Sequence, residues 1–441
     1  MPSRTTGSVG RMGLAVRDWT HWATGYGLPR VMLKLLARQG DPLARLLTID
    51  SKPVDDIYPL IEQIRARGRM SRIPGAGWVS VDAQILRELL RDSRIRTAKP
   101  NDRSPFRLGE WILAKSDPDV MNPIEPPSML VTDPPEHARL RKPVTRAFTP
   151  RALDRLRTRI HDLAHGLLDE LDGREQCDLV AEYASQIPMA VIAELMGMPR
   201  DDTPYLLHVA ETATNLLGIV GPSWRDFRSG ITILREFEGY VGKHVERLRG
   251  SDGDSILSDV IRHGDLTDDE LTMLVALLFG AGFITTTHIL GKAVIALVRH
   301  PDQLAALCAN PNGWPNAVEE ILRYDTPVQV VPRVAAEDVE IGGYSIRAGE
   351  AVFIMYGGAN RDPAVFDEPG AFDTTRANAR DHLTFGTGVH TCLGAALGRM
   401  EVQIGLQALF ERFPQLSLAG EPTYNNIIGL HGLKHLPVSL G

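Results

Sequence analysis

The chain has 441 residues, of which 43% are hydrophobic and 23% are charged, an ordinary globular composition. Its formal net charge is −7 and its basic residues are dispersed among acids, so nucleic acid is not expected as a partner. Three cysteines in a chain of this length argue against a disulfide framework and favour a reducing, cytoplasmic location. Residues 1–17 lack an uninterrupted apolar run, which excludes a typical signal peptide.

No linker, fixed-period repeat or low-complexity tract divides the sequence. We therefore expect one large domain over residues 51–441, preceded by an extension over residues 1–50 that packs on it. Within the extension, residues 27–47 have the pattern of a basic amphipathic helix. A packing or surface helix is the favoured interpretation, and attachment to a membrane surface is the alternative.

Local patterns predict the first elements of the domain in chain order. Residues 51–67 are expected to form a helix, and residues 70–81 form a β pair around a Gly-Ala-Gly turn. A helix capped by Asp82 follows over residues 82–90. Residues 94–132 hold prolines and scattered apolar residues, a pattern typical of a loop over a pocket.

One long apolar segment differs from the other predicted helices. Thr267 and Glu270 have the spacing of a capping box, and the sequence is then apolar on every face over residues 271–298. Polar residues interrupt this run before roughly 18 consecutive apolar residues accumulate, so a buried central helix is favoured over a membrane span. Gly280 and Gly282 lie in its middle, where they indicate a close approach of another group to the helix backbone.

The remaining patterns complete a mainly α chain. Helices are predicted, with breaks, from residue 136 to residue 324. The span 337–355 changes to β character, with a hairpin that turns at a Gly-Gly pair. A last helix and short strands near residues 430–438 close the chain, which gives a helical fold with small β-sheets.

The segment with the most chemical information covers residues 385–394 and reads Phe-Gly-Thr-Gly-Val-His-Thr-Cys-Leu-Gly. It places Phe385, Gly388, Cys392 and Gly394 at fixed spacing. A thiolate bound to iron needs backbone N–H donors around it, and glycines allow a tight loop to supply them. The predicted helix after Cys392 adds its positive end. A lone cysteine is more often a structural core residue, but this spacing favours a metal ligand.

This segment resembles the haem-binding loop of the cytochrome P450 family, and further matches cover the chain from about residue 51 to its end. The resemblance implies a triangular-prism fold, mainly α with small β-sheets, with a long central helix over the haem. It also implies haem b with Cys392 as the axial iron ligand, O2 as oxidant and electrons from NAD(P)H. The sequence has no phosphate-binding loop or cysteine cluster for a redox centre of its own, so separate proteins must deliver these electrons.

The resemblance identifies those proteins as a ferredoxin and its reductase, which dock on the cysteine side of the haem. It further implies a monomer without a membrane span that acts on a small-molecule substrate. A non-catalytic haem sensor or carrier is the alternative function, and a zinc or purely structural cysteine protein is a weaker one, because no paired ligands accompany Cys392.

A buried charge triad is also implied by the resemblance. Glu320 and Arg323 match the Glu-x-x-Arg pair of the family, and Arg376 matches the arginine that joins the pair. Glu62 and Arg65 have the same spacing, but they precede the long helix and are interpreted as a surface i,i+3 pair. Since buried charges must be paired, we expect the triad to have a structural role near the cysteine loop.

Four residues resemble the family's anchors for the haem propionates, namely His137, Arg141, Arg333 and His390. His137 and Arg141 are four residues apart and therefore share one helix face. Cationic side chains and imidazole N–H groups suit the two carboxylates of haem. Each residue alone would be interpreted as a solvated surface group, but together they favour a cofactor site.

The middle of the long helix resembles the oxygen-activating groove of the family through Ala281, Gly282, Thr285 and Thr286. Family members usually carry an acid immediately before the threonine, whereas this chain has Ile284. Thr285 can donate a hydrogen bond to dioxygen, but the usual carboxylate for proton relay is missing. A water chain or another acid could replace it, the substrate could relay the proton, or the reaction could be an oxidative coupling or ring closure.

The predicted function is that of a haem-thiolate monooxygenase that hydroxylates, couples or cyclises a largely apolar small molecule in secondary metabolism. The groove favours this enzyme over a sensor, because a sensor has no use for oxygen activation. The resemblance implies mainly apolar substrate contacts. They are Trp111, Leu216, Leu217, Ile219, Phe283, Val328, Val330, Ile427 and Ile428.

Overall fold

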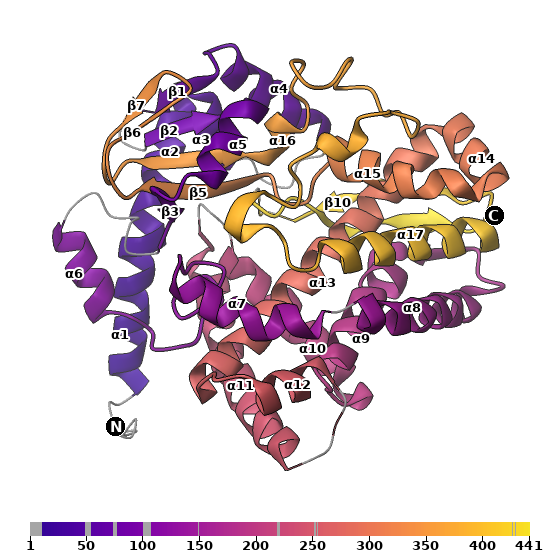
Figure 1. The fold of residues 1–441 in the computed structure, drawn as a ribbon, viewed down its shortest axis with the longest axis horizontal. Helices are drawn as coiled ribbons and strands as arrows, with labels where there is room; N and C mark the ends of the chain where they lie inside the picture. Colours follow the sequence, from indigo (N-terminus) through magenta and orange to yellow (C-terminus); the bar gives the residue numbers. More distant parts are fainter. Residues whose placement is uncertain are drawn as a thin grey trace.

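The computed structural model describes residues 11–48, 54–73, 77–99, 107–148, 150–217, 221–250, 253, 255–425, 427 and 429–441 (Figure 1). Its α-helices are α1 Arg11–Trp22, α2 Leu28–Arg38, α3 Pro42–Leu47, α4 Val54–Arg65, α5 Ala83–Arg91, α6 Arg107–Lys115, α7 Glu136–Ala147, α8 Pro150–Leu171, α9 Gln186–Leu195, α10 Thr203–Thr214, α11 Trp224–Arg249, α12 Ile256–His263, α13 Asp268–Arg299, α14 Pro301–Ala309, α15 Trp314–Tyr324, α16 Tyr356–Ala359 and α17 Ala395–Arg412. Its strands are β1 Met70–Ile73, β2 Gly77–Ser80, β3 Ile95–Thr97, β4 Gln176–Asp178, β5 Val330–Ala335, β6 Val339–Ile341, β7 Tyr344–Ile346, β8 Ala351–Met355, β9 Ser417–Leu418, β10 Thr423–Tyr424, β11 Leu433–His435 and β12 Pro437–Ser439. The prediction of a mainly helical chain with small sheets is confirmed.

The largest sheet joins five strands in the order β1-β2-β8-β5-β3 and lies above the main helical layer in Figure 1. β2 and β8 pair in parallel, and the other neighbours pair antiparallel. The predicted hairpin is β6 and β7, and its turn residues Gly342 and Gly343 have the positive φ values of +58° and +85° that such a turn requires. The sequence patterns missed β3 and β5, because β3 has three residues and Pro332 interrupts β5. They also missed α6, which lies inside the stretch expected to be irregular.

The predicted N-caps Asp82 and Thr267 are present, whereas Ser51, the N-cap expected for the helix over 51–67, lies outside the described residues. The Asp82 carboxylate accepts a hydrogen bond from the backbone N–H of Ile85 at 2.9 Å at the start of α5. At the start of α13, the Thr267 hydroxyl accepts from the Glu270 N–H at 3.3 Å, and the Glu270 carboxylate accepts from the Thr267 N–H at 2.9 Å. This capping box starts α13 at residue 268, three residues before the apolar run begins.

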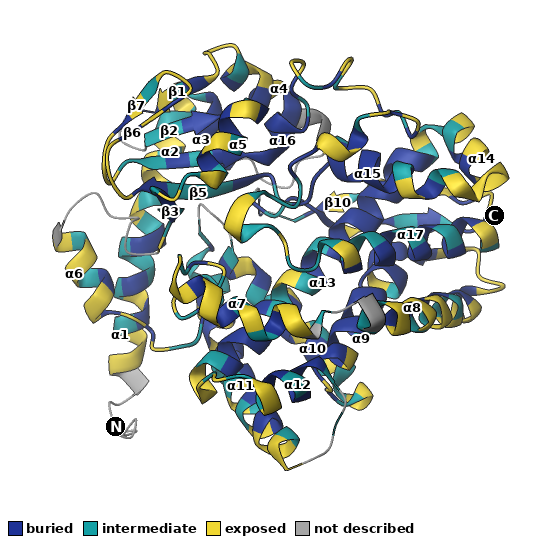
Figure 2. Cartoon of the chain, in the orientation of Figure 1, coloured by how far each residue is buried: buried dark blue, intermediate teal, exposed yellow. Residues whose placement is uncertain are grey.

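Helix α13 is the buried axis of the helical layer. α9, α11 and α17 pack against it, and most of its length is buried, as the dark ribbon in Figure 2 shows. By length and composition it could cross a membrane, but 72% of its most apolar stretch is buried inside the protein. The prediction of a buried central helix is therefore confirmed.

The described part of the N-terminal extension contacts two separate regions of the chain. The indole N–H of Trp22 donates to the carbonyl oxygen of Pro222 at 3.0 Å, and the Tyr26 ring lies 5.5 Å from the Phe227 ring. α3 is almost entirely buried beside α4. The predicted single helix over 27–47 is wrong, because Gly40 adopts a φ of +90° and the chain restarts at Pro42 as a second helix.

The charge triad is assembled in the core between α15 and the segment that follows α16. Arg323 donates to both carboxylate oxygens of Glu320 at 2.6 and 2.8 Å, and Arg376 donates to the same carboxylate at 3.2 and 3.3 Å. Both side chains of the first pair have no exposed surface. The remaining N–H groups of Arg323 bind the carbonyl oxygens of Asn360, Pro369 and Ala371. The triad thus joins α15 to the loop that leads to the cysteine segment.

We predict that Glu320→Gln lowers the free energy of unfolding by about 3–5 kcal/mol, because two buried guanidinium groups lose their counter-charge. Glu62→Gln is a matched control, since Glu62 and Arg65 repeat the motif with a half-exposed carboxylate, and its cost should stay below about 1 kcal/mol. Chemical denaturation of the two variants and the unmodified protein measures both values. Equal losses in the two variants would contradict the structural role of the triad.

Candidate functional site

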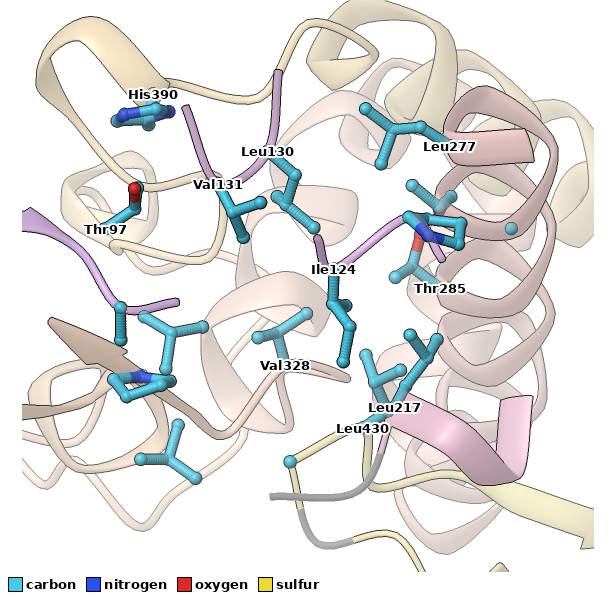
Figure 3. Close-up of a pocket in the computed structure, with 18 of the residues that line it drawn as sticks. Thr97, Ile124, Leu130, Val131, Leu217, Leu277, Thr285, Val328, His390 and Leu430 are labelled. Carbon is cyan, nitrogen blue, oxygen red and sulfur yellow. The ribbon is translucent and has the colours of Figure 1, made fainter. Parts of the chain in front are cut away.

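A cavity of about 1230 Å³ lies between α13, the segment before α7 and the cysteine loop. In Figure 3, Thr285 and Leu277 point into it from α13, while Ile124, Leu130 and Val131 project from the segment before α7. This segment is part of the stretch that the sequence interprets as a loop over a pocket. The volume exceeds the roughly 300–1,000 Å³ of a pocket for one small ligand, so it has room for a cofactor and a substrate together.

Glycines shape the cysteine loop at the floor of this cavity. Gly386 and Gly388 have φ values of +66° and +77°, in the left-handed region. A Cβ atom on Gly388 would lie 2.4 Å from the carbonyl oxygen of Leu90, so the position also lacks space for a side chain. The N–H of Cys392 donates to the carbonyl oxygen of Phe385 at 2.8 Å and closes the loop. The sequence spacing of glycines and cysteine therefore corresponds to one compact turn.

The thiol of Cys392 lines the cavity and has accessible surface there, although the sulfur lies well inside the protein. Burial raises the pKa of this thiol, against the opposing effect of a hydrogen bond from the Gly394 N–H. The charges of Arg141 and Arg399 also favour the thiolate, but less. Burial therefore favours the neutral thiol of Cys392, and a bound metal ion would favour the thiolate.

The four predicted propionate anchors all line one end of the cavity. The imidazole rings of His137 and His390 lie 4.3 Å apart, and burial together with His390 and Arg141 lowers the pKa of His137 to about 4. His390 Nε2 is buried and lies 3.6 Å from the Asp133 carboxylate. Arg141 donates to the carbonyl oxygens of Val389 and Thr391 at 3.1 and 2.6 Å, so it also fixes the cysteine loop.

The groove residues of α13 face the cavity from the opposite side. The Thr285 hydroxyl donates to the carbonyl oxygen of Ala281 at 2.8 Å, which leaves its oxygen free to accept a hydrogen bond from a cavity ligand. A Cβ atom on Gly282 would lie 3.3 Å from the Ile192 side chain, so α9 approaches α13 closely at this glycine, as predicted. Gly280 has no neighbour at that range within the described chain and lines the cavity, so the expected close approach there stays a prediction.

Sequence reasoning missed one acid in this wall. Glu401 of α17 lines the cavity, and its carboxylate accepts a hydrogen bond from the Thr286 hydroxyl at 3.2 Å. Burial raises the pKa of Glu401 to about 8. The signal that could have revealed it is an acid among apolar neighbours, since Met400 and Val402 beside it are both buried. A carboxyl group is thus present near the groove despite Ile284.

The predicted substrate contacts separate into three groups. Leu216, Leu217, Val328 and Val330 line the cavity. Trp111, Phe283 and Ile427 do not line the cavity, which corrects their prediction as wall residues. Trp111 is exposed on α6, and the side chains of the other two are buried outside the cavity wall. Gly429 and Leu430 line the cavity instead of Ile427, so the part of this loop that forms the wall lies two to three residues further along the chain. Ile219 and Ile428 lie outside the described residues.

Comparisons with known proteins agree on one family. The cytochrome P450 family model matches residues 315–427. Cytochrome P450 140 of Mycobacterium tuberculosis is 38% identical over 97% of this chain and 98% of its own length. The 6-deoxyerythronolide B hydroxylase of Saccharopolyspora erythraea is 36% identical over 82% of this chain and 90% of its own length. The crystal structure of P450BioI with an acyl carrier protein that carries hexadec-9Z-enoic acid has a TM-score of 0.80, with 31% identity over 87% of this chain and 98% of that one.

The chain belongs to the cytochrome P450 family, and it is a monooxygenase that requires haem, O2 and redox partners. The site fits this cofactor on physical grounds. The cavity is large enough, the Cys392 thiol lines it as a ligand for iron, and two arginines and two histidines that suit carboxylates line it as well. Cys392 would hold the iron, and His137, Arg141, Arg333 and His390 would hold the propionates.

We predict that Glu401→Gln removes a pH dependence of stability. The unfolded carboxyl titrates near pH 4.5 and the folded one near pH 8, so only the unfolded chain releases this proton between those values. The free energy of unfolding of the unmodified protein should therefore fall across this window, by an amount on the order of a few kcal/mol, and then level off. The variant should show a flatter profile by chemical denaturation at pH 5–9. Parallel profiles would contradict a buried, protonated Glu401.

Proposed function

We propose that the protein is a haem b monooxygenase that oxidises a largely apolar small molecule of secondary metabolism. The observation that carries this proposal is that Cys392 and the α13 groove line the same cavity. Thr285 of the groove and Cys392 are 107 residues apart in the sequence. They line the same cavity only because the fold brings them together. A sensor or carrier would need the thiolate but not a hydroxyl groove opposite it.

When bound, the haem supplies reductive activation of O2, which the protein itself cannot perform. Cys392 supplies the thiolate, held by the glycine turn, and Arg141 fixes that turn through two carbonyl oxygens. Thr285 presents a hydroxyl oxygen as an acceptor and so holds a water molecule or a substrate hydroxyl in the cavity. The surrounding apolar side chains exclude bulk water and bury the substrate.

The substrate is proposed to be large and apolar, with few polar groups. The walls opposite the cysteine are formed mainly by aliphatic side chains, among them Leu216, Leu217, Leu277 and Val328. The named relatives act on or bind molecules of this character, a 6-deoxyerythronolide and a long-chain acyl group. Hydroxylation is the reaction that the first relative's name supports, and coupling or cyclisation is the second candidate because Ile284 replaces the usual acid.

For proton delivery we favour Glu401 over the substrate. A carboxyl group with a pKa of about 8 is protonated at neutral pH and can donate, which isoleucine cannot. Thr286 contacts this carboxyl and is the neighbour of Thr285 in α13, so a proton can reach the groove through one or two hydroxyl groups and cavity water. Glu401 is then the other acid that the sequence hypothesis left open.

The electrons are proposed to come from NAD(P)H through a ferredoxin reductase and an acidic ferredoxin. Basic residues flank the cysteine loop on its outer side, where Arg91 donates to the Thr387 hydroxyl at 3.2 Å and Arg141 binds the loop carbonyls. Lys142 and Arg146 are exposed on the same helix as Arg141. A positive surface beside the thiolate suits an anionic electron donor.

We predict that Cys392→Ala abolishes the red-shifted Soret band of the reduced carbon monoxide complex, because the thiolate ligand is lost. Cys308→Ala is the matched control, since Cys308 is an exposed cysteine of α14 outside the cavity wall, and it should retain the band. Absorption spectra of the purified, reduced proteins measure this. A red-shifted band in Cys392→Ala would refute the assigned ligand.

We predict that Glu401→Gln lowers coupled turnover by about 10–100-fold and increases the share of electrons released as hydrogen peroxide, because proton transfer by a placed acid contributes about that much. Glu411→Gln, on the exposed side of the same helix, should leave coupling unchanged. Product, NAD(P)H and peroxide are measured with a ferredoxin system. If Glu401→Gln stays coupled while substrate analogues without a polar group uncouple, the substrate relays the proton instead.

A further inference from the structure

Helix α2 presents an apolar face to solvent. Leu28, Val31, Met32 and Leu35 follow the i, i+3, i+4, i+7 spacing of one helix face, and they are 68%, 58%, 45% and 51% exposed. The inward face is also apolar, because Leu33 packs against the buried cluster of α3 and α4. A helix at the surface of a globular protein ordinarily has polar residues on its outer face. α2 therefore has a second apolar face that the rest of the described chain does not cover.

The neighbouring helices extend this character. Nine of the eleven large apolar residues with high exposure in the described chain belong to α1, α2 and α6, including Trp19 (52%) and Trp111 (60%). α6 packs against the run from α1 to α2, and Leu113 of α6 would meet a Cβ on Gly25 at 3.0 Å. Figures 1 and 2 show α1 and α6 side by side at one edge, with exposed surface on both. We call α1, α2 and α6 the apolar edge.

The charge of this edge is opposite to that of the whole protein. α1, α2 and α6 contain seven lysines and arginines and two acids, in a chain with a net charge of −7. Of the two acids, Asp18 pairs with Arg235 at 3.4 Å and Glu110 is exposed on α6. Arg30, Lys34 and Arg38 of α2 thus add positive charge beside the apolar face. This excess is concentrated at the exposed apolar residues.

We propose that the apolar edge docks on the surface of an anionic phospholipid membrane. Aliphatic residues on one helix face, basic residues on its flanks and exposed tryptophans are the combination that lies in the lipid interface. Anionic lipid headgroups match the basic flank. A second copy of the chain fits less well, because apposed α2 helices would bring two sets of cations together. The exposed face of α2 therefore supports attachment to a membrane surface, which the sequence left as the alternative to a packing or surface helix.

The same helix borders the cavity, because Pro29, Met32 and Leu33 are among its lining residues. Glu110 of α6 also lines it. A docked apolar edge would therefore place one side of the cavity near the lipid, where an apolar substrate concentrates. This consequence rests on the proposed function, whereas the docking itself does not.

The test is vesicle flotation of the haem-loaded, full-length protein. Vesicles of phosphatidylglycerol and phosphatidylcholine serve as the anionic probe, and phosphatidylcholine vesicles serve as the neutral one. We expect binding to the anionic vesicles and at least tenfold weaker binding to the neutral ones. Val31→Gln/Leu35→Gln and Lys34→Gln/Arg38→Gln should each weaken anionic binding at least tenfold. Arg155→Gln/Arg157→Gln removes two exposed cations from α8 and should have no effect.

Thermal melting and the reduced carbon monoxide spectrum of each variant establish that fold and haem site are intact, which is expected because the changed side chains are exposed on α2. Trp19 should additionally contribute a blue shift of fluorescence on binding, which Trp19→Phe reduces. Absence of anionic binding at low salt would overturn the proposal, as would full binding by Val31→Gln/Leu35→Gln. Lipid-free dimers that this double variant dissociates would assign the edge to a second copy instead. Loss of the carbon monoxide band in the unmodified protein would contradict the proposed function and not the docking.

Discussion

Holding a thiolate inside an apolar interior is the constraint on which the other features of the structure depend. Burial raises the pKa of Cys392, whereas a backbone donor of the loop and the charges of Arg141 and Arg399 favour the thiolate. The loop reaches this shape because Gly386 and Gly388 take positive φ values that other residues avoid. It keeps the shape because Arg141 binds its carbonyl oxygens from α7. Two separate parts of the chain, the cysteine loop and α7, thus determine the position of one sulfur atom.

Burial of charge also explains how the rest of the core is organised. Glu320 is neutralised by two arginines, and the N–H groups left over on Arg323 bind backbone carbonyls, so no charge in the triad lacks a partner. Glu401 differs, because no cation among the described residues lies beside it and it keeps its proton up to about pH 8. One carboxyl group therefore holds the fold together as an anion, while the other stays available as an acid.

The sequence predicted the parts of the molecule in which local pattern and tertiary structure agree. The capping box at Thr267, the buried run of α13 and the glycine-cysteine turn each carry their signal within a few residues. β5 was missed because its partner β3 is distant in sequence and Pro332 weakens the local pattern. The position of Phe283 was wrong for a related reason. A helix that is apolar on all faces does not reveal which of them meets a cavity, and a one-residue rotation moves Phe283 into the core while Ile284 lines the cavity.

The acid next to the groove illustrates a more general limit. Ile284 indicates from sequence that a carboxylate is missing, but chemistry in a folded protein depends on which groups share a space and not on which are neighbours in sequence. Glu401 reaches that space from α17, 115 residues beyond its partner Thr286, and no local pattern connects the two. The same holds for α2, whose two apolar faces look alike in sequence. Only packing shows that Leu33 lies partly buried against the core while Val31 and Leu35 remain exposed. The uncovered side chains therefore point to a surface function that the sequence alone does not assign.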